Sequence, residues 1–131
     1  MEASQSLVRV LTHTLGHMQA FLQHIPAQAY AQPLDIFNQS STGQHTRHVI
    51  EFLQCLIHQC QCDGGVINYE KRLRDKAIEQ EPSQALAAIA EIIENLEQKE
   101  LPQQLILETQ YAAHLPVHRI ETSLERELIY N

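Results

Sequence analysis

Two histidines three residues apart, His45 and His48, are the side chains of this sequence best suited to chemistry. They lie in the stretch 41–60, STGQHTRHVIEFLQCLIHQC, where apolar residues recur at helical spacing. Counting in helical steps from His45 predicts one helix face that carries both imidazoles together with Val49, Phe52, Cys55 and Leu56. We expect this apolar face, and both imidazoles with it, to be turned toward the core. A neutral imidazole is a common ligand of zinc-class ions, and a buried one needs a hydrogen-bond partner or a metal. The pair is therefore a candidate metal site, and a hydrogen-bonded core position is the alternative.

The start of this helix is marked by Ser41 with Gln44 three positions later, the spacing of a capping box. Both histidines then fall in or near the first turn. The only glycine pair, Gly64–Gly65, predicts the end of the helix. Two ligands alone do not complete a tight site, since structural zinc takes four protein ligands and catalytic zinc three plus water.

Other side chains with chemical potential favour plainer interpretations. His13 and His17 have metal-like spacing but lie at the edge of an apolar stripe, which favours solvated histidines. Pro116 interrupts the helical period around His114 and His118, so we expect these two in a loop or strand. We expect Cys55 to be a buried apolar thiol, because the sequence shows nothing that would lower its pKa.

The segment RLRD offers two guanidinium groups, Arg72 and Arg74, that could bind an anionic substrate. An internal salt bridge is the favoured interpretation, because acids such as Asp75 and Glu70 lie in the same segment. A backbone carbonyl is the other partner we consider for these arginines.

The composition excludes several classes of protein. The 131 residues carry 16 acids against 9 bases, a formal charge of -7, which argues against a nucleic-acid surface. No apolar run reaches the ~20 residues of a membrane span, and the first residues lack a signal-peptide layout. The odd number of cysteines (Cys55, Cys60 and Cys62) favours thiols in a reducing compartment, so we expect a cytoplasmic protein.

The remaining elements follow from periodicity. Residues 4–24 and 82–101 each predict an amphipathic helix, the second beginning at Pro82–Ser83 and stopped by Pro102. A loop is expected through Pro33 after the first helix, and residues 66–82 predict a connecting segment with one short helical turn. From residue 105 the period changes to alternation, so residues 105–111 and 117–121 predict two strands joined by a turn.

A fourth helix is expected to follow Thr122–Ser123–Leu124–Glu125, a second capping pattern, with Leu124, Leu128 and Ile129 facing inward. Only about two turns remain before Asn131, and a helix of that length is marginal alone. Three amphipathic helices plus this cap predict a mainly α four-helix bundle, residues 1–131 as a single domain, with a small β-hairpin before an incomplete fourth helix. Either a longer natural chain or a partner chain would cover the exposed apolar face.

Three segments together resemble the DinB/YfiT-like family of metal-dependent proteins: GQHTRHVIEFLQCL (43–56), NYEKRLRD (68–75) and RIETSLERELIYN (119–131). Their order along the chain also matches, and the resemblance covers roughly residues 5–131. It implies a four-helix bundle with up-down-down-up helices and a divalent metal, zinc or nickel, held by three histidines. Some relatives are thiol-dependent transferases that use a low-molecular-weight thiol.

Carried over to this sequence, the second-helix ligand of the family falls on His48, and His45 is a supporting or alternative ligand. The family's fourth-helix pair, H-x-x-x-H, has no counterpart up to Asn131, because no histidine follows His118. The resemblance therefore implies a metal site of which this sequence carries only part.

Two hypotheses result. In the first, the chain is a divalent-metal-binding protein that works in its full-length form as a thiol-dependent transferase or a metal-dependent hydrolase on a small-molecule thiol or another substrate. In the second, it is a non-catalytic helical bundle that acts through self-association or a protein partner. Both expect a homodimer and involve neither nucleic acid nor membrane.

Overall fold

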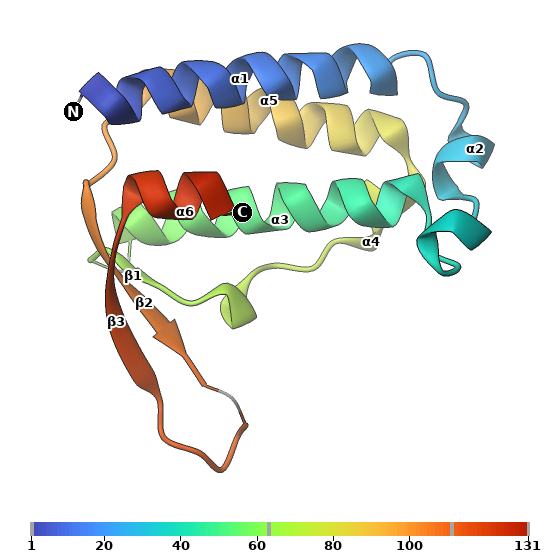
Figure 1. The fold of residues 1–131 in the computed structure, drawn as a ribbon. Coiled ribbons are helices and arrows are strands. Elements are labelled where there is room, and N and C mark those ends of the chain that lie inside the picture. The colour runs from blue at the N-terminus through green and yellow to red at the C-terminus, as the bar shows by residue number, and fades with distance from the viewer. Residues whose placement is uncertain (1, 63, 111, 131) are drawn as a thin grey trace.

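The computed structural model describes residues 2–62, 64–110 and 112–130 and is mainly helical, with one small mixed sheet (Figure 1). Three long helices form the body: α1 (Glu2–Leu22), α3 (Thr42–Cys62) and α5 (Pro82–Gln98). Both α1 and α3 pack against α5. The short helix α6 (Leu124–Tyr130) packs against α1 and follows the sheet. The described helical and strand content confirms the mainly α fold expected from periodicity.

The core is one apolar cluster shared by these helices and the sheet. Its fully buried members come from every layer, for example Leu15 of α1, Ile50 of α3, Ile89 of α5 and Ile67 of the sheet. Burial of such side chains is the main favourable term in folding, about 1.5–3 kcal/mol for each large aliphatic. The helical stripes read from the sequence at residues 4–24 and 82–101 thus meet in the interior, with the third long helix ending at Gln98 rather than Leu101.

The beginning of α3 is the capping box that the sequence predicted. The backbone N–H of Gln44 donates to Ser41 Oγ at 3.0 Å, and Ser41 N–H donates to Gln44 Oε1 at 2.9 Å. These bonds satisfy donors that have no partner within a helix. The helix ends at Cys62, just before Gly64 and Gly65, which both take positive φ (65° and 82°).

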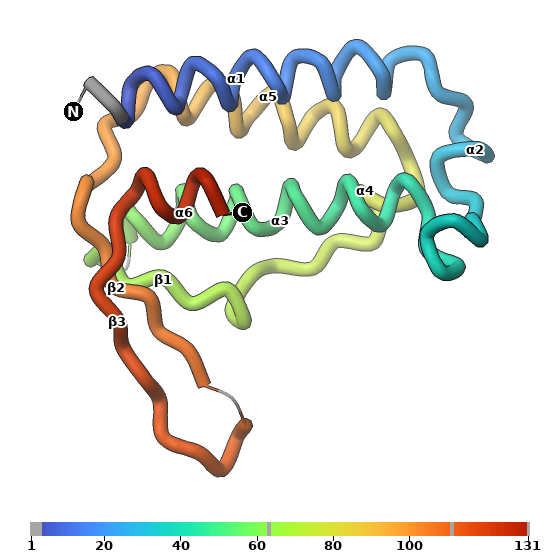
Figure 2. Tube along the Cα trace, in the orientation of Figure 1, coloured from blue at the N-terminus to red at the C-terminus, as the bar shows by residue number. Residues whose placement is uncertain are grey.

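Two segments expected to be irregular are more ordered than predicted. The linker after the first helix contains α2 (Ala27–Ala31) and the 3₁₀ turn η1 (Asp35–Phe37). Residues 66–82 contain β1 (Val66–Ile67), the 3₁₀ turn η2 (Tyr69–Lys71) and α4 (Lys76–Gln80), where one helical turn was expected. Figure 2 shows this second segment running back along α3. Its order comes from tertiary contacts with α3, such as the two hydrogen bonds between the Gln59 side chain and the backbone of Asn68 (2.6 and 3.2 Å). The spacing of apolar residues in the sequence does not predict such contacts.

The predicted hairpin is confirmed as β2 (Gln104–Thr109) and β3 (His118–Ser123), an antiparallel pair in which Leu107 faces Ile120. Strand β1 adds to β2 in parallel, giving the order β1-β2-β3. Tyr111, the expected end of the first strand, lies outside the described residues. Helix α6 begins at Leu124 as predicted, with Ser123 Oγ accepting from the N–H of Arg126 at 3.2 Å. Leu124 and Leu128 are buried, but Ile129 is 59 % exposed, so its predicted inward position is wrong.

Candidate functional site

Helix α3 turns only part of the face that the histidine spacing predicted to the core, because Cys55 and Leu56 of that face are buried but its two histidines are not. The buried stripe runs through Gly43, Thr46, Ile50, Leu53, Ile57 and Cys60, while His45 and His48 are exposed. Both stripes have helical spacing, and packing of the neighbouring elements on α3 buries the one that carries Ile50, Leu53 and Ile57. The prediction that both imidazoles face the core is therefore wrong. Exposure leaves their nitrogens accessible from solvent.

The two rings are held by different neighbours. His45 Nε2 lies 3.3 Å from Ser40 Oγ, and its ring meets Phe37 edge-on at 4.8 Å between centroids. His48 instead packs on Phe52, one turn further along α3, at 4.4 Å between centroids. His45 is thus tied to the loop before α3, and His48 to the outer face of the helix itself.

A line of aromatic and polar contacts continues from His48 to α6. Phe52 stacks on Tyr69 at 4.9 Å, and the guanidinium of Arg72 lies 4.7 Å above the Phe52 ring. The Tyr69 hydroxyl donates to Oε1 of the buried Glu127 at 2.7 Å. Thr122 Oγ1 donates to the other oxygen of Glu127 at 2.6 Å. The His48 ring therefore rests on a layer that is fixed at both ends by polar contacts.

Beneath this layer lies a buried charge cluster centred on Glu51, which is 2 % exposed. Its Oε1 lies 3.4 Å from Arg47 Nε and 3.9 Å from Arg72 Nε, and its Oε2 accepts the backbone N–H of Asp75 at 2.8 Å. A buried carboxylate is stable only with such partners. The sequence analysis predicted that Arg72 would pair with an acid of its own segment, but its acidic partner is Glu51 of α3. The expected backbone partner is confirmed, because Arg72 Nη1 donates to the carbonyl of Tyr69 at 3.0 Å.

The metal-binding capacity of this face is partial. Among residues 2–62, 64–110 and 112–130, no three His, Cys, Asp or Glu side chains come together in a way that could hold a metal ion. The exposed His48 imidazole can offer one nitrogen ligand, and His45 stands on the same helix with its own contacts. The described residues therefore do not complete a zinc or nickel site, and no reaction step can be derived for one.

The cysteines differ in their environments. None of the three forms a disulfide. Cys55 is buried, as predicted, with Sγ 3.5 Å from the carbonyl of Asn68. Burial, together with Glu127 and Cys55 nearby, raises the pKa of Cys60 to about 11. Cys62 is exposed, with Sγ 3.8 Å from His58 Nδ1, a contact signalled in the sequence only by the four-residue spacing.

The remaining histidines fit their sequence interpretation. His13 and His17 are exposed on α1, with ring centroids 4.5 Å apart. His114 and His118 are exposed in the hairpin, one in its loop and one at the start of β3.

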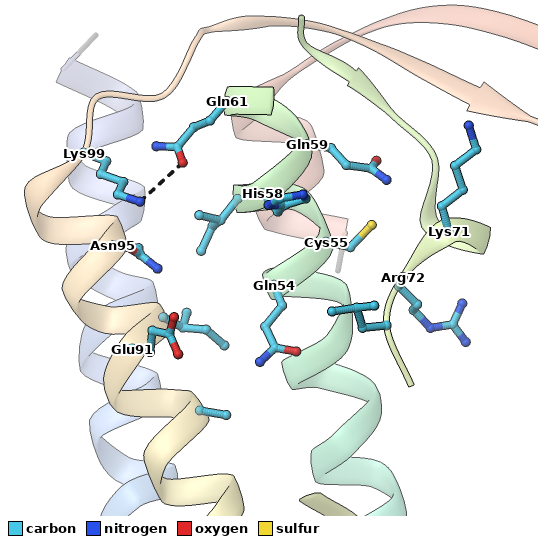
Figure 3. Close-up of a pocket in the computed structure, with 14 residues that line it drawn as sticks. Gln54, Cys55, His58, Gln59, Gln61, Lys71, Arg72, Glu91, Asn95 and Lys99 are labelled. Carbon is cyan, nitrogen blue, oxygen red and sulfur yellow. Dashed lines mark hydrogen bonds between the residues drawn. The ribbon is translucent and has the colours of Figure 1, made fainter. Parts of the chain in front are cut away.

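A cavity of about 430 Å³ lies between α3 and α5 (Figure 3). Its floor is apolar, from Ile57, Ala88 and Ile92. Polar groups of α3 and α5 rim it: Gln54, His58, Gln61, Glu91, Asn95 and Lys99. Lys99 Nζ donates to Gln61 Oε1 at 3.4 Å across the upper end. Lys71, Arg72 and Leu73, from the segment that runs back along α3, also line the cavity. This cavity, which the sequence analysis missed, has the size of a small-molecule site.

Comparison of the chain with protein-family models, with curated proteins and with solved structures found no match. Over the described residues, no helix combines the length and apolar character that crossing a membrane requires.

Proposed function

We propose that this protein binds a divalent metal of the zinc or nickel class as a DinB/YfiT-like four-helix bundle. In this proposal α1, α3, α5 and α6 are the bundle helices, and the β2–β3 hairpin precedes the short fourth helix. His48 is the ligand that α3 supplies, and His45 supports it from the same helix. The resemblance of segments 43–56, 68–75 and 119–131 supports this assignment.

The observation that carries the proposal is the supported position of His48. Its imidazole is exposed, yet its ring packs on Phe52, which is itself fixed by Tyr69 and Arg72 over the buried Glu51 cluster. A ligand held in one orientation by packed neighbours loses little freedom when a metal binds.

The remaining ligands must come from outside the described residues or from a second chain. A bound metal would act as a Lewis acid that lowers the pKa of a thiol or water at the site. A low-molecular-weight thiol or another small molecule remains our proposal for the substrate. The resemblance implies two classes of activity for this site, that of a thiol-dependent transferase and that of a metal-dependent hydrolase.

The test is metal binding by the purified chain. We expect elemental mass spectrometry after dialysis against Zn²⁺ or Ni²⁺ to find bound metal in the unaltered protein and in the control His24→Ala. His48→Ala should lose that metal, because it removes the oriented nitrogen, and His45→Ala should weaken binding less. Titration calorimetry would give the number of chains per metal, which separates a site within one chain from a site between chains.

Absence of metal from the unaltered chain, or equal binding by His48→Ala and His24→Ala, would contradict the proposal. Circular dichroism of each variant shows whether the fold is kept. His48 and His24 are both exposed, so neither substitution removes a core contact.

A second candidate function, association without catalysis, is favoured by the end of α6. Ile129 is 59 % exposed and Tyr130 is 79 % exposed, side by side on one short helix. Exposed apolar side chains of this kind often mark an interface. Replacing both with serine should lower the affinity of self-association, measured by sedimentation equilibrium, if this face carries it, and unchanged association would rule the face out.

A further inference from the structure

Strand β3 (His118–Ser123) is the outer strand of the sheet and, within the part of the chain that the structure describes, pairs with β2 alone. Its first four residues are exposed. The hairpin projects from the helices, with the outer edge of β3 uncovered by any element (Figure 1). Such an edge presents backbone N–H and C=O groups that another strand can pair with.

The backbone groups that face outward can be identified from the ladder. Leu124 N–H donates to the carbonyl of Gln103 at 3.0 Å, and the register places Ser123 opposite Gln104. In an antiparallel pair, hydrogen-bonded and non-hydrogen-bonded positions alternate along each strand. Counting back from Leu124, residues 122, 120 and 118 bond toward β2. Residues 119, 121 and 123 therefore direct their N–H and C=O groups outward.

From this edge we infer that two copies of the chain associate by antiparallel pairing of β3 with β3, about a two-fold axis at Ile120. Ile120 then faces itself in a non-hydrogen-bonded pair. Arg119 faces Glu121 of the partner subunit, and both residues present outward backbone groups, so they form a hydrogen-bonded pair. The two three-stranded sheets become one continuous six-stranded sheet.

The charges on the strand suit this register. Arg119 is already held by Glu108 of β2, with Nε and Nη2 at 3.1 and 3.0 Å from Oε2, and Lys71 Nζ lies 4.0 Å from the other oxygen. Glu121 takes part in none of the ion pairs among the described residues. Pairing places Glu121 of the partner subunit beside Arg119, which extends an alternating row of charges across the sheet. Opposite charges directly across two strands favour that pairing, and like charges oppose it.

The apolar side chain at the axis also suits a second copy. Ile120 is 49 % exposed although its neighbour in the register is the apolar Leu107. Self-pairing covers Ile120 with the same residue of the other chain. The two-fold symmetry requires one surface to fit itself, and this strand does so in both charge and apolar character.

Disulfide trapping tests the register. In a Cys62→Ser background, Ile120→Cys should cross-link to a dimer under oxidised glutathione, because Cα atoms of a non-hydrogen-bonded pair lie about 4.5 Å apart, within disulfide range. Glu121→Cys is the matched control. Its equivalent in the partner lies diagonally across at about 7–8 Å, so it should cross-link far less. Equal yields for the two variants, or none for Ile120→Cys, would overturn the inference.

Charge reversal tests the same pairing without cysteines. Glu121→Arg places Arg against Arg across the axis, and Arg119→Glu places Glu against Glu, so each variant alone should show a self-association constant reduced tenfold or more in sedimentation equilibrium. Mixed together, they should form a heterodimer. Arg119→Glu also removes the ion pair with Glu108 and so could prevent folding. In that case the Glu121→Arg variant and the Ile120→Cys cross-link still test the pairing of β3 with β3.

The assays are run with a chelator present, so the inference stands or fails apart from metal binding. The Ile129→Ser/Tyr130→Ser variant should keep its self-association. If that variant alone becomes monomeric while Glu121→Arg stays dimeric, the interface is α6 and the β3 pairing is wrong.

Discussion

At the scale of single residues, Gly43 shows how closely the elements around α3 approach one another. A Cβ at this position would overlap the backbone carbonyl of Glu79 and press on the ring of Tyr30. Tyr30 is fully buried, and its hydroxyl donates to the carbonyl of Ile78. The beginning of α3, whose first two turns carry His45 and His48, is thus positioned by direct backbone approach to α4.

We predict that Gly43→Ala destabilises the protein by about 1–3 kcal/mol, because the added methyl group has no room and α4 must move. Gly16 is the matched control. It lies inside α1 with nothing within 4 Å of an added Cβ. Gly16→Ala should raise stability by about 0.5–1 kcal/mol through the lower helix propensity of glycine. Urea unfolding of both variants measures the difference, and equal effects would refute this account of Gly43.

The cysteines give a second prediction at this scale. We expect iodoacetamide at about pH 8, close to the ordinary pKa of a cysteine thiol, to modify the exposed Cys62 in the folded protein. Cys60 should stay unmodified under the same conditions. The pKa of Cys60 is raised to about 11 by burial, so its reactive thiolate is scarce. Peptide mass mapping before and after unfolding in urea locates the label, and Cys62→Ser should abolish the native reaction. Labelling of Cys60 as fast as Cys62 in the folded state would show that the core is open there.

At the scale of elements, Glu108 fastens the hairpin to the segment beside α3. Its carboxylate accepts from Asn68 Nδ2 at 3.0 Å and pairs with Arg119 of β3. The hydrogen bond from Asn68 and then that from Arg119 lower the pKa of Glu108 below its ordinary value of 4.5. A carboxylate with a depressed pKa stabilises the fold above its unfolded pKa, and this contribution disappears as the pH falls through its folded value.

We therefore predict that Glu108→Gln lowers the melting temperature at neutral pH, and that the difference from the unaltered protein shrinks as the pH falls below 4.5. Glu97→Gln, on the exposed side of α5, is the control and should change the melting temperature little. Thermal melts followed by circular dichroism over a pH series give both curves. A Glu108→Gln difference that stays constant into acid would mean that the charge of Glu108 does not fasten the hairpin.

At the scale of the whole molecule, the arrangement links the two proposed activities through α6. The carboxylate of Glu127 in α6 accepts hydrogen bonds from two hydroxyl groups. One belongs to Tyr69, in the layer that supports His48, and the other to Thr122, near the end of β3. The position of α6 therefore depends on the same contacts that orient His48 and end the free strand. The metal assay on His48→Ala and the association assay on Glu121→Arg probe opposite ends of this connection.

The sequence alone determined the local features of this protein. The period of apolar residues predicted the three long helices and the hairpin, because burial of one face imposes a spacing of 3.6 residues on a helix and 2 on a strand. The capping box at Ser41 and Gln44 was equally local, since all its atoms lie within one turn.

Tertiary structure alone decided which face of α3 is buried and which groups pair across the chain. Two stripes on α3 have helical spacing, and only the packing of α4, α5 and the other neighbouring elements buries Ile50, Leu53 and Ile57 and leaves His45 and His48 in solvent. The partner of Arg72 is Glu51, 21 positions earlier, rather than an acid in its own segment. A buried charge is satisfied by whichever group the fold brings near, and sequence distance carries no information about that.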